Sequence, residues 1–166
     1  RPIDEIKVLK HGHVSFVLNS NQRPTYTITK KRPKHWVKFN QISKKAAMAI
    51  MISEDWGFYN HPGYDTNQIK EAVFDMVRGK RFRGASTISQ QLVKNVFLSS
   101  EKSLWRKIRE LVITNQVESR LTKNKILEIY LNSIEFGEGL YGIKNASYFY
   151  FKKHPAYLTA REGAFL

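Results

Sequence analysis

The chain has 166 residues, of which 42% are hydrophobic and 25% are charged, and this composition suits one compact domain with its own core. Its net charge of +14 predicts an anionic partner, which leaves nucleic acids, anionic membranes and phosphorylated substrates as the classes to consider. The absence of Cys excludes a disulfide framework and a thiolate zinc site, and the longest apolar run, 46–52, is too short to span a bilayer.

Residues 1–40 differ from the rest of the chain and are predicted to form an N-terminal extension. Apolar residues alternate over 14–18, a turn-prone segment covers 19–24, and the β-rich sequence TYTIT follows at 25–29. This pattern predicts a hairpin of two short strands. The basic sequence KKRPKHWVK at 30–38 then predicts a linker or an arm that lies on the surface.

Helical patterns begin after this extension and continue to the end of the chain. Residues suited to helix capping precede most of them. The predicted fold is mainly α, with a catalytic domain over 41–166 that looks cut at its C-terminus. We expect helices over 44–52, 67–78, 88–96, 104–120 and 123–134, an aromatic-rich helix after a glycine loop, and a last helix after Thr159, with the N-caps Ser43, Asp65 or Thr66, Thr87, Ser103 and Thr122.

The first candidate site is the segment SEDWGFYNHPGYD at 53–65. Glu54 and Asp55 stand where an Ala-rich helix gives way to aromatic residues, Gly and Pro. We expect the aromatic neighbours to desolvate these carboxylates partly, and a carboxyl pKa raised toward neutrality suits a general base. The alternative is a solvated helix end, with His61 hydrogen-bonded to the loop backbone.

The second candidate is the segment GASTISQQLVKN at 84–95. Its apolar residues fit one buried helical stripe, but the remaining face carries uncharged polar groups and one cation, Lys94. Gly84 and Ala85 allow a ligand close to the backbone, and the free N–H groups of a first helical turn attract anions. These features predict a groove for a sugar or a pyrophosphate, and the alternative is a helix packed against a polar interface. The polar residues are Ser86, Thr87, Ser89, Gln90, Gln91 and Asn95.

The third candidate is the predicted helix over 104–120, which carries two apolar stripes. Glu110 lies along the second stripe, where a carboxylate needs a partner, and Arg106 is one turn away. A structural salt bridge is therefore the alternative to a role in a site. The predicted main core stripe consists of Leu104, Ile108, Leu111 and Val112, and the second stripe consists of Ile113, Val117 and Leu121.

The segment that follows is interpreted mostly as scaffold. Apolar residues recur at core spacing in the next predicted helix, and a loop with three glycines comes after it. Asn132, at the end of that helix, is predicted to cap it or to hold a loop in place. The predicted core residues are Ile126, Leu127, Tyr130 and Leu131.

Together and in this order, these segments resemble the peptidoglycan glycosyltransferases of glycosyltransferase family 51. The likeness runs from about Trp36 to Leu166. Ser89 replaces a usual Thr, and Lys152 stands where the family often has Gly, which affects only the expected loop conformation. The matching motifs are Glu54, Asp55, Phe58, His61, Gly63 and Asp65 for the first, GASTISQQLVKN for the second, RKIRE at 106–110 for the third, and ILEIYLN at 126–132 through GIKNASYFYF at 142–151 for the fourth.

The resemblance implies a two-lobed, lysozyme-like helical fold and an enzyme that polymerises lipid II, a disaccharide-peptide on undecaprenyl pyrophosphate. It implies a β-1,4 linkage formed with inversion at C1 of the donor MurNAc. Glu54 would be the general base, and Lys94 and Arg106 would stabilise the leaving pyrophosphate. Glu110 would position the donor, through Arg106 or a metal. The other implied substrate-binding residues are Asp55, Phe58, His61, Ser86, Thr87, Gln90, Gln91, Asn95, Lys102 and Lys107.

The resemblance also bears on cofactors, partners and location. It implies no cofactor that is certain to be required. A divalent cation, Mg or Mn, is an expectation, and Glu110 is its candidate ligand. The expected partners are lipid II, the growing glycan strand, the anionic membrane surface and cell-wall synthesis proteins, but no nucleic acid. The expected place is the periplasmic face of the bacterial cytoplasmic (inner) membrane, with an anchor upstream of Arg1. The arm 30–38 and the segment MVRGKRFRG at 76–84 are expected to meet anionic lipid.

Two other classes of protein fit parts of the sequence. A lysozyme-like muramidase would share the helical fold and a catalytic Glu, but hydrolysis of a neutral glycosidic bond does not need cations suited to a pyrophosphate. A nucleic-acid-binding module would explain the charge of +14 but would have no use for Glu54. Its binding would depend steeply on salt.

Overall fold

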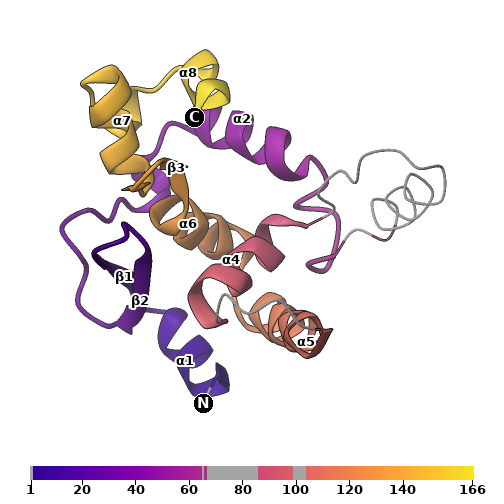
Figure 1. Cartoon of the computed structure of the whole chain (residues 1–166). Helices are drawn as coiled ribbons and strands as arrows, with labels where there is room; N and C mark the ends of the chain where they lie inside the picture. The colour runs from indigo at the N-terminus through magenta and orange to yellow at the C-terminus, as the bar shows by residue number, and fades with distance from the viewer. Residues whose placement is uncertain (1, 65, 67–85, 99–103) are drawn as a thin grey trace, which may run out of the picture.

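The computed structural model describes residues 2–64, 66, 86–98 and 104–166 (Figure 1). The helix predicted over 67–78 and the segment 76–84 predicted to face the membrane lie outside the described residues. The predicted caps Asp65 and Ser103 lie outside them as well. None of the described helices combines the length and the apolar character that crossing a membrane requires.

The described residues are mainly helical, which confirms the predicted fold class. Their short strands form two antiparallel pairs, β1 with β2 and β3 with β4. Two 3₁₀ turns cover Phe39–Gln41 and Pro155–Tyr157. In chain order the other elements are α1 (Pro2–Leu9), β1 (His13–Leu18), β2 (Pro24–Thr29), α2 (Lys44–Asp55), α4 (Ile88–Phe97), α5 (Leu104–Arg120), α6 (Lys123–Ser133), β3 (Glu135–Gly137), β4 (Leu140–Tyr141), α7 (Ile143–Phe151) and α8 (Ala160–Phe165).

Four helices begin at the predicted caps, because a Ser or Thr oxygen accepts a backbone N–H of the first turn in each. Two of these caps belong to capping boxes, which Gln90 completes for α4 and Glu162 completes for α8. The sequence patterns do not predict α1, whose eight residues are too few to show a helical period. The confirmed caps are Ser43 for α2, Thr87 for α4, Thr122 for α6 and Thr159 for α8.

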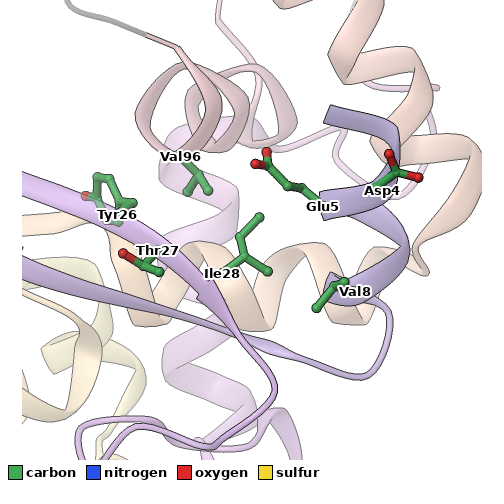
Figure 2. Close-up of a pocket in the computed structure, with 7 residues that line it drawn as sticks. All are labelled: Asp4, Glu5, Val8, Tyr26, Thr27, Ile28 and Val96. Atoms are coloured by element: carbon green, nitrogen blue, oxygen red, sulfur yellow. The ribbon is translucent and has the colours of Figure 1, made fainter. Parts of the chain in front are cut away.

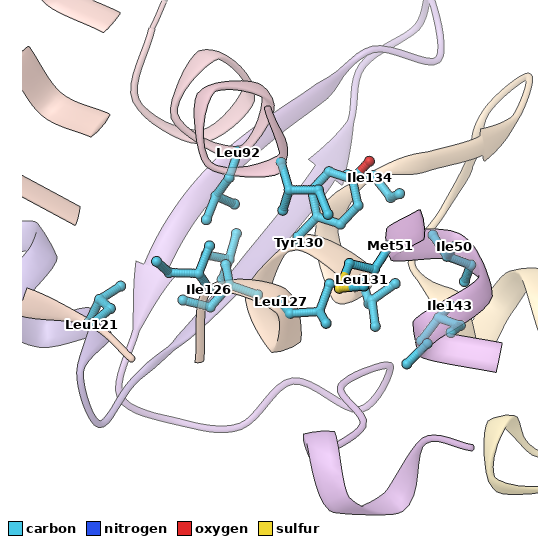
Figure 3. Close-up of a cluster of buried hydrophobic side chains, with 14 of the residues drawn as sticks. Ile50, Met51, Leu92, Leu121, Ile126, Leu127, Tyr130, Leu131, Ile134 and Ile143 are labelled. Carbon is cyan, nitrogen blue, oxygen red and sulfur yellow. The ribbon is translucent and has the colours of Figure 1, made fainter. Parts of the chain in front are cut away.

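Helix α6 lies in the middle of the fold. In Figure 1, α2, α7 and α8 lie on one side of α6, and α4, α5 and the β1–β2 hairpin lie on the other. Figure 3 shows Leu92 of α4 and Met51 of α2 close to the buried side chains of α6. All four core residues predicted on α6 are buried, each with 1% exposure or less. The two groups of elements are thus held together by apolar packing on one helix.

The helix that carries Glu54 is fixed by a close contact with the end of the described chain. A Cβ on Gly163 of α8 would lie 2.5 Å from Cα of Ala46 on α2, so no larger residue fits there without a shift. Ala46 and Ala47 are buried on the same helix. Small residues therefore let α2 and α8 approach closely, and this contact positions α2.

The predicted β1–β2 hairpin is confirmed, and it packs on the helices. Phe16 lies opposite Tyr26 in the antiparallel register, and Val14 is fully buried in the core. The Tyr26 hydroxyl donates a hydrogen bond to the Ser133 carbonyl at the end of α6, at 2.7 Å. The hairpin therefore shares the core of the helical part.

The basic arm at 30–38 is anchored at its C-terminal end. Trp36 and Val37 are buried. The amide of Asn132 accepts from the Val37 N–H and donates to the Val37 carbonyl, both at 2.8 Å. This pair confirms the predicted role of Asn132 in holding a loop. The core therefore continues across residue 40, and the domain division predicted there stays a prediction.

Helix α5 turns its other apolar stripe to the core. Three residues of the predicted main stripe are exposed, namely Ile108, Leu111 and Val112, so this prediction is wrong for them. The second stripe is buried together with Glu110 and Thr114. The physical reason is that Glu110 has cationic partners on its own helix, which offset the cost of burying its charge.

Lys152, which departs from the resemblance described above, has a backbone conformation that favours Gly. It ends α7 with a φ of 56°, in the left-handed region. Its N–H donates to the Tyr148 carbonyl and closes the helix end. Because a side chain in this conformation costs about 1 kcal/mol relative to Gly, the departure affects local strain and leaves the fold unchanged.

Candidate active site

Glu54 lies in the last turn of α2 and its side chain is exposed. The expectation of a partly desolvated carboxylate is therefore wrong for Glu54. The neighbouring rings do not cover it, because Phe58 is fully buried in the core while Trp56 is 70% exposed. Its oxygen Oε2 accepts a hydrogen bond from Nε2 of Gln91, at 3.1 Å. Glu54 is thus oriented by an amide and open to solvent.

Gln91 connects Glu54 to the core. The hydroxyl of Tyr130 on α6 donates to Oε1 of Gln91, at 3.2 Å. Burial raises the pKa of Tyr130, and the negative charges of Glu54 and Asp55 raise it further. The tyrosine therefore stays a neutral donor. Because it binds the amide oxygen of Gln91, the amide nitrogen is left to point to Glu54.

Asp55, next to Glu54, is 1% exposed and makes only internal contacts among the described residues. One oxygen lies 2.8 Å from Nε2 of His61, and the other accepts the N–H of Ile88 at 3.0 Å. Nδ1 of His61 accepts the N–H of Gly63, so the ring carries its proton on Nε2. Asp55 and His61 therefore join the loop after α2 to the first residue of α4. Substrate binding by either of them stays a prediction.

The N-terminal turn of α4 divides the predicted polar face into a buried and an accessible part. Thr87, Ser89 and Gln90 are buried. The Thr87 hydroxyl donates to the Gly63 carbonyl at 2.6 Å, and the Ser89 hydroxyl donates to Glu118. These contacts match the alternative of a helix packed against a polar interface. Ser86, Gln91, Lys94 and Asn95 are partly or fully accessible.

Glu110 is buried on α5 and paired with two cations. Its oxygens accept hydrogen bonds from Nη1 of Arg106, at 3.1 Å, and from Nζ of Lys107. The side chain of Glu110 is 2% exposed, against 21% for Arg106 and 46% for Lys107. The predicted Arg106–Glu110 salt bridge is confirmed. The carboxylate holds two basic side chains at the solvent boundary of α5.

This pairing bears on the expected metal. Both oxygens of Glu110 face cationic donors, so its carboxylate does not fit a divalent cation in this arrangement. Among the described residues, no three His, Asp or Glu side chains are grouped to hold a metal ion. A divalent cation in the reaction stays an untested prediction.

A cleft of about 830 Å³ brings the basic residues together with the hairpin. Lys94 and Asn95 of α4 and Arg106 of α5 are among its lining residues. The sequence patterns do not predict the other residues of this cleft, because only the fold brings strands that are distant in the chain to α4. They are Asn19, Arg23, Pro24, Thr25, Tyr26, Glu135 and Tyr141, with Val96 and Leu98 from the end of α4 and the residue after it.

Helix α4 links this cleft to the acid. Glu54 does not line the cleft, but Gln91, which holds Glu54, precedes Lys94 by three residues on α4. At 1.5 Å per residue the two positions are about 4.5 Å apart along the helix axis. A role of Glu54 together with Lys94 and Arg106 stays a prediction. Phe58 lies in the core, and Lys102 lies outside the described residues.

A second, smaller cavity of about 360 Å³ lies between α1, β2 and α4. Figure 2 shows Glu5 extending from α1 toward Val96, with Ile28 of β2 beside it. Its charged lining residues are the acids Asp4 and Glu5. Negative side chains repel phosphate, so of the two cavities only the 830 Å³ cleft suits an anionic ligand.

Comparisons with known proteins show what the chain is similar to. The sequence model of the family described as Transglycosylase matches residues 21–166. The biosynthetic peptidoglycan transglycosylase of Paraburkholderia xenovorans (strain LB400) is 48% identical over 130 residues, which are 78% of this chain and 54% of that protein. Penicillin-binding protein 1F of Bacillus subtilis (strain 168) is 39% identical over 165 residues, which are 99% of this chain and 23% of that protein. The chain thus spans about half of the first relative and about a quarter of the second.

Proposed function

Because the chain belongs to the transglycosylase family, whose sequence model matches most of its length, we propose that it is a peptidoglycan glycosyltransferase. It polymerises lipid II into β-1,4-linked glycan strands and releases undecaprenyl pyrophosphate. The observation that carries this proposal is the placement of Lys94 and Arg106 in one cleft, one helical turn along α4 from the residue that orients Glu54.

In the proposed reaction, Glu54 takes the proton from the 4-hydroxyl of the acceptor GlcNAc. The hydroxyl oxygen attacks C1 of the donor MurNAc from the face opposite the pyrophosphate. The new C–O bond forms as the bond between C1 and the pyrophosphate oxygen breaks, so the configuration at C1 inverts. An exposed carboxylate is open to an incoming sugar, and this access suits a general base.

The leaving pyrophosphate gains negative charge as its bond to C1 breaks. Lys94 and Arg106 supply fixed positive charge in the cleft, and preorganised charge of this kind stabilises the transition state more than the ground state. Glu110 is a positioning residue, because it reaches the substrate only through Arg106 and Lys107. The amide nitrogen of Gln91 donates to Glu54 and to the carbonyl of Ser86, so Gln91 supports the acid from the start of α4.

The proposed place of action is the outer face of the bacterial cytoplasmic membrane, where a lipid-linked substrate is accessible. The arm 30–38 supports this proposal with five exposed cations, Lys30, Lys31, Arg32, Lys34 and Lys38. Each basic residue close to an anionic membrane contributes about 1 kcal/mol of attraction.

The test of the proposed function is incubation of the purified chain with labelled lipid II and separation of the products by length. Under the proposal, lipid II is consumed and long glycan appears together with undecaprenyl pyrophosphate. A muramidase would leave lipid II unpolymerised and would shorten preformed glycan. Release of short products from glycan without consumption of lipid II would overturn the proposal.

A further inference from the structure

The cleft contains a third cation, Arg23, which comes from the β1–β2 hairpin. The turn before Arg23 is held by its own hydrogen bonds. The side-chain oxygen of Asn19 accepts the N–H of Asn21 at 2.9 Å and the N–H of Arg23 at 3.0 Å. The N–H of Asn19 donates to the carbonyl of Arg23 at 2.9 Å. The backbone of Arg23 is therefore fixed from both sides.

The turn between β1 and β2 also packs against the β3–β4 hairpin. A Cβ on Gly139, in the β3–β4 turn, would lie 3.0 Å from the amide oxygen of Gln22 and 3.5 Å from its Cβ. The ring of Phe16 packs against Tyr141 with centroids 5.6 Å apart. Together with the Tyr26 hydrogen bond to α6, these contacts dock the hairpin along its length. The β1–β2 hairpin is thus held in place by these contacts where it lines the cleft.

The charges in the cleft favour an anion. Its charged lining residues are Arg23, Lys94 and Arg106, against one acid, Glu135. Glu110 already pairs with Arg106, whereas the salt bridges formed between described residues include neither Arg23 nor Lys94. Arg23 and Lys94 therefore line the cleft, and no described acid lies within salt-bridge distance of either.

Glu135 is engaged on the wall itself. Its oxygen Oε1 accepts the N–H of Gly139 at 3.0 Å, and it lies opposite Tyr141 in the β3–β4 register. Burial and the charge of Glu135 raise the pKa of Tyr141, and the charge of Arg23 acts against this rise. Arg23, Glu135 and Tyr141 are thus close enough to influence one another at the mouth of the cleft.

We propose that Arg23 binds the pyrophosphate of the substrate from the side opposite α4 and α5, so that the hairpin is part of the substrate site. This inference rests on the proposed function for the identity of the pyrophosphate. A guanidinium group presents paired N–H donors that match two phosphate oxygens, which makes Arg the better residue for holding a phosphate in one orientation. Lys94 and Arg106 then face the same group from the opposite side.

The test compares the variants Arg23→Gln and Arg23→Lys with the matched control Arg161→Gln. Arg161 is an exposed Arg of α8 outside the cleft, so its replacement removes the same charge elsewhere. Binding of inorganic pyrophosphate is measured by calorimetry, and polymerisation of labelled lipid II is measured on the same proteins. Circular dichroism checks that the folds are equal.

We expect Arg23→Gln to weaken pyrophosphate binding roughly tenfold or more and to raise KM for lipid II more than it lowers kcat. Arg23→Lys should restore part of the affinity, and Arg161→Gln should match the unaltered protein. Equal pyrophosphate binding by Arg23→Gln and the unaltered protein, or none by either, would overturn the role of Arg23.

The two readouts separate this inference from the proposed function. If the unaltered protein polymerises lipid II and Arg23→Gln binds pyrophosphate equally well, only the role of Arg23 fails. If pyrophosphate binding falls in Arg23→Gln but the unaltered protein forms no glycan, the anion site stands and the proposed function fails.

Discussion

The end of α2 and the middle of α5 each carry an acid of the proposed site, and the surroundings of the two acids are opposite. Glu54 on α2 is exposed and held by one neutral amide. Glu110 on α5 is 2% exposed and held by two cations. An acid that must accept a proton needs access and a free lone pair, whereas an acid that positions cations needs neither. The contrast is the reason why we propose chemistry for Glu54 and positioning for Glu110.

The largest expected effect is that of Glu54→Gln. We expect kcat for lipid II polymerisation to fall about 10²–10⁴-fold, because the amide cannot accept the proton from the attacking hydroxyl. The side chain is exposed, so the free energy of unfolding should stay within about 0.5 kcal/mol of the original value. Retained polymerisation would remove Glu54 from the mechanism and break the contrast with Glu110.

Glu110→Gln should have the next largest effect. The substitution removes the carboxylate charge that Arg106 and Lys107 share, and we expect kcat to fall about 10²-fold because the cations are misplaced. Affinity for pyrophosphate should change little, because both positive charges remain. Glu118→Gln is the control, since it breaks the pair between Glu118 of α5 and Lys123 of α6 and should reduce stability more than kcat. A loss of activity as large with Glu118→Gln would show that Glu110 contributes only to folding.

Asp55→Asn tests the acid next to Glu54, which has the opposite environment. The substitution weakens the hydrogen bonds to His61 and to the first turn of α4. Because hydrogen bonds to a charged group contribute about 1.5–3 kcal/mol each, we expect the free energy of unfolding to fall by roughly 2–3 kcal/mol in urea titrations. Under conditions where the variant is folded, kcat should fall less than in Glu54→Gln. An equal fall with unchanged stability would place Asp55 in the chemistry.

The smallest expected effect is that of Gln91→Leu, which removes the amide between Tyr130 and Glu54. A hydrogen bond of about 1 kcal/mol corresponds to roughly a fivefold change, so we expect kcat to fall about fivefold. Gln41→Leu is a matched control, because Gln41 is exposed and does not line the cleft. If kcat is the same in Gln91→Leu and Gln41→Leu, Glu54 needs no amide to orient it.

Much of the local structure could be predicted because it depends on residues close in the chain. The caps at Ser43, Thr87 and Thr122 each join a side chain to a backbone N–H three residues later. The Arg106–Glu110 pair spans one helical turn. Such contacts are set by helix geometry alone, so the sequence is enough to find them.

The features that could not be predicted depend on what an element packs against. Helix α5 has two apolar stripes, and either could have packed on the core. The stripe that contains Glu110 is the one that is buried. The aromatic residues after Glu54 predicted a desolvated acid, but Phe58 points into the core and leaves Glu54 exposed. Arg23 lines the cleft where the β1–β2 turn packs against Gly139 of the β3–β4 turn. No short-range pattern reports such contacts.

The most direct test of the account is a crystal structure of the Glu54→Gln protein with a lipid II donor and acceptor bound. The account predicts that the acceptor 4-hydroxyl lies within hydrogen-bonding distance of the side chain at position 54. It also predicts that the donor pyrophosphate contacts Lys94 and Arg106 in the cleft. A donor bound away from that cleft, or an acceptor hydroxyl out of reach of position 54, would contradict it.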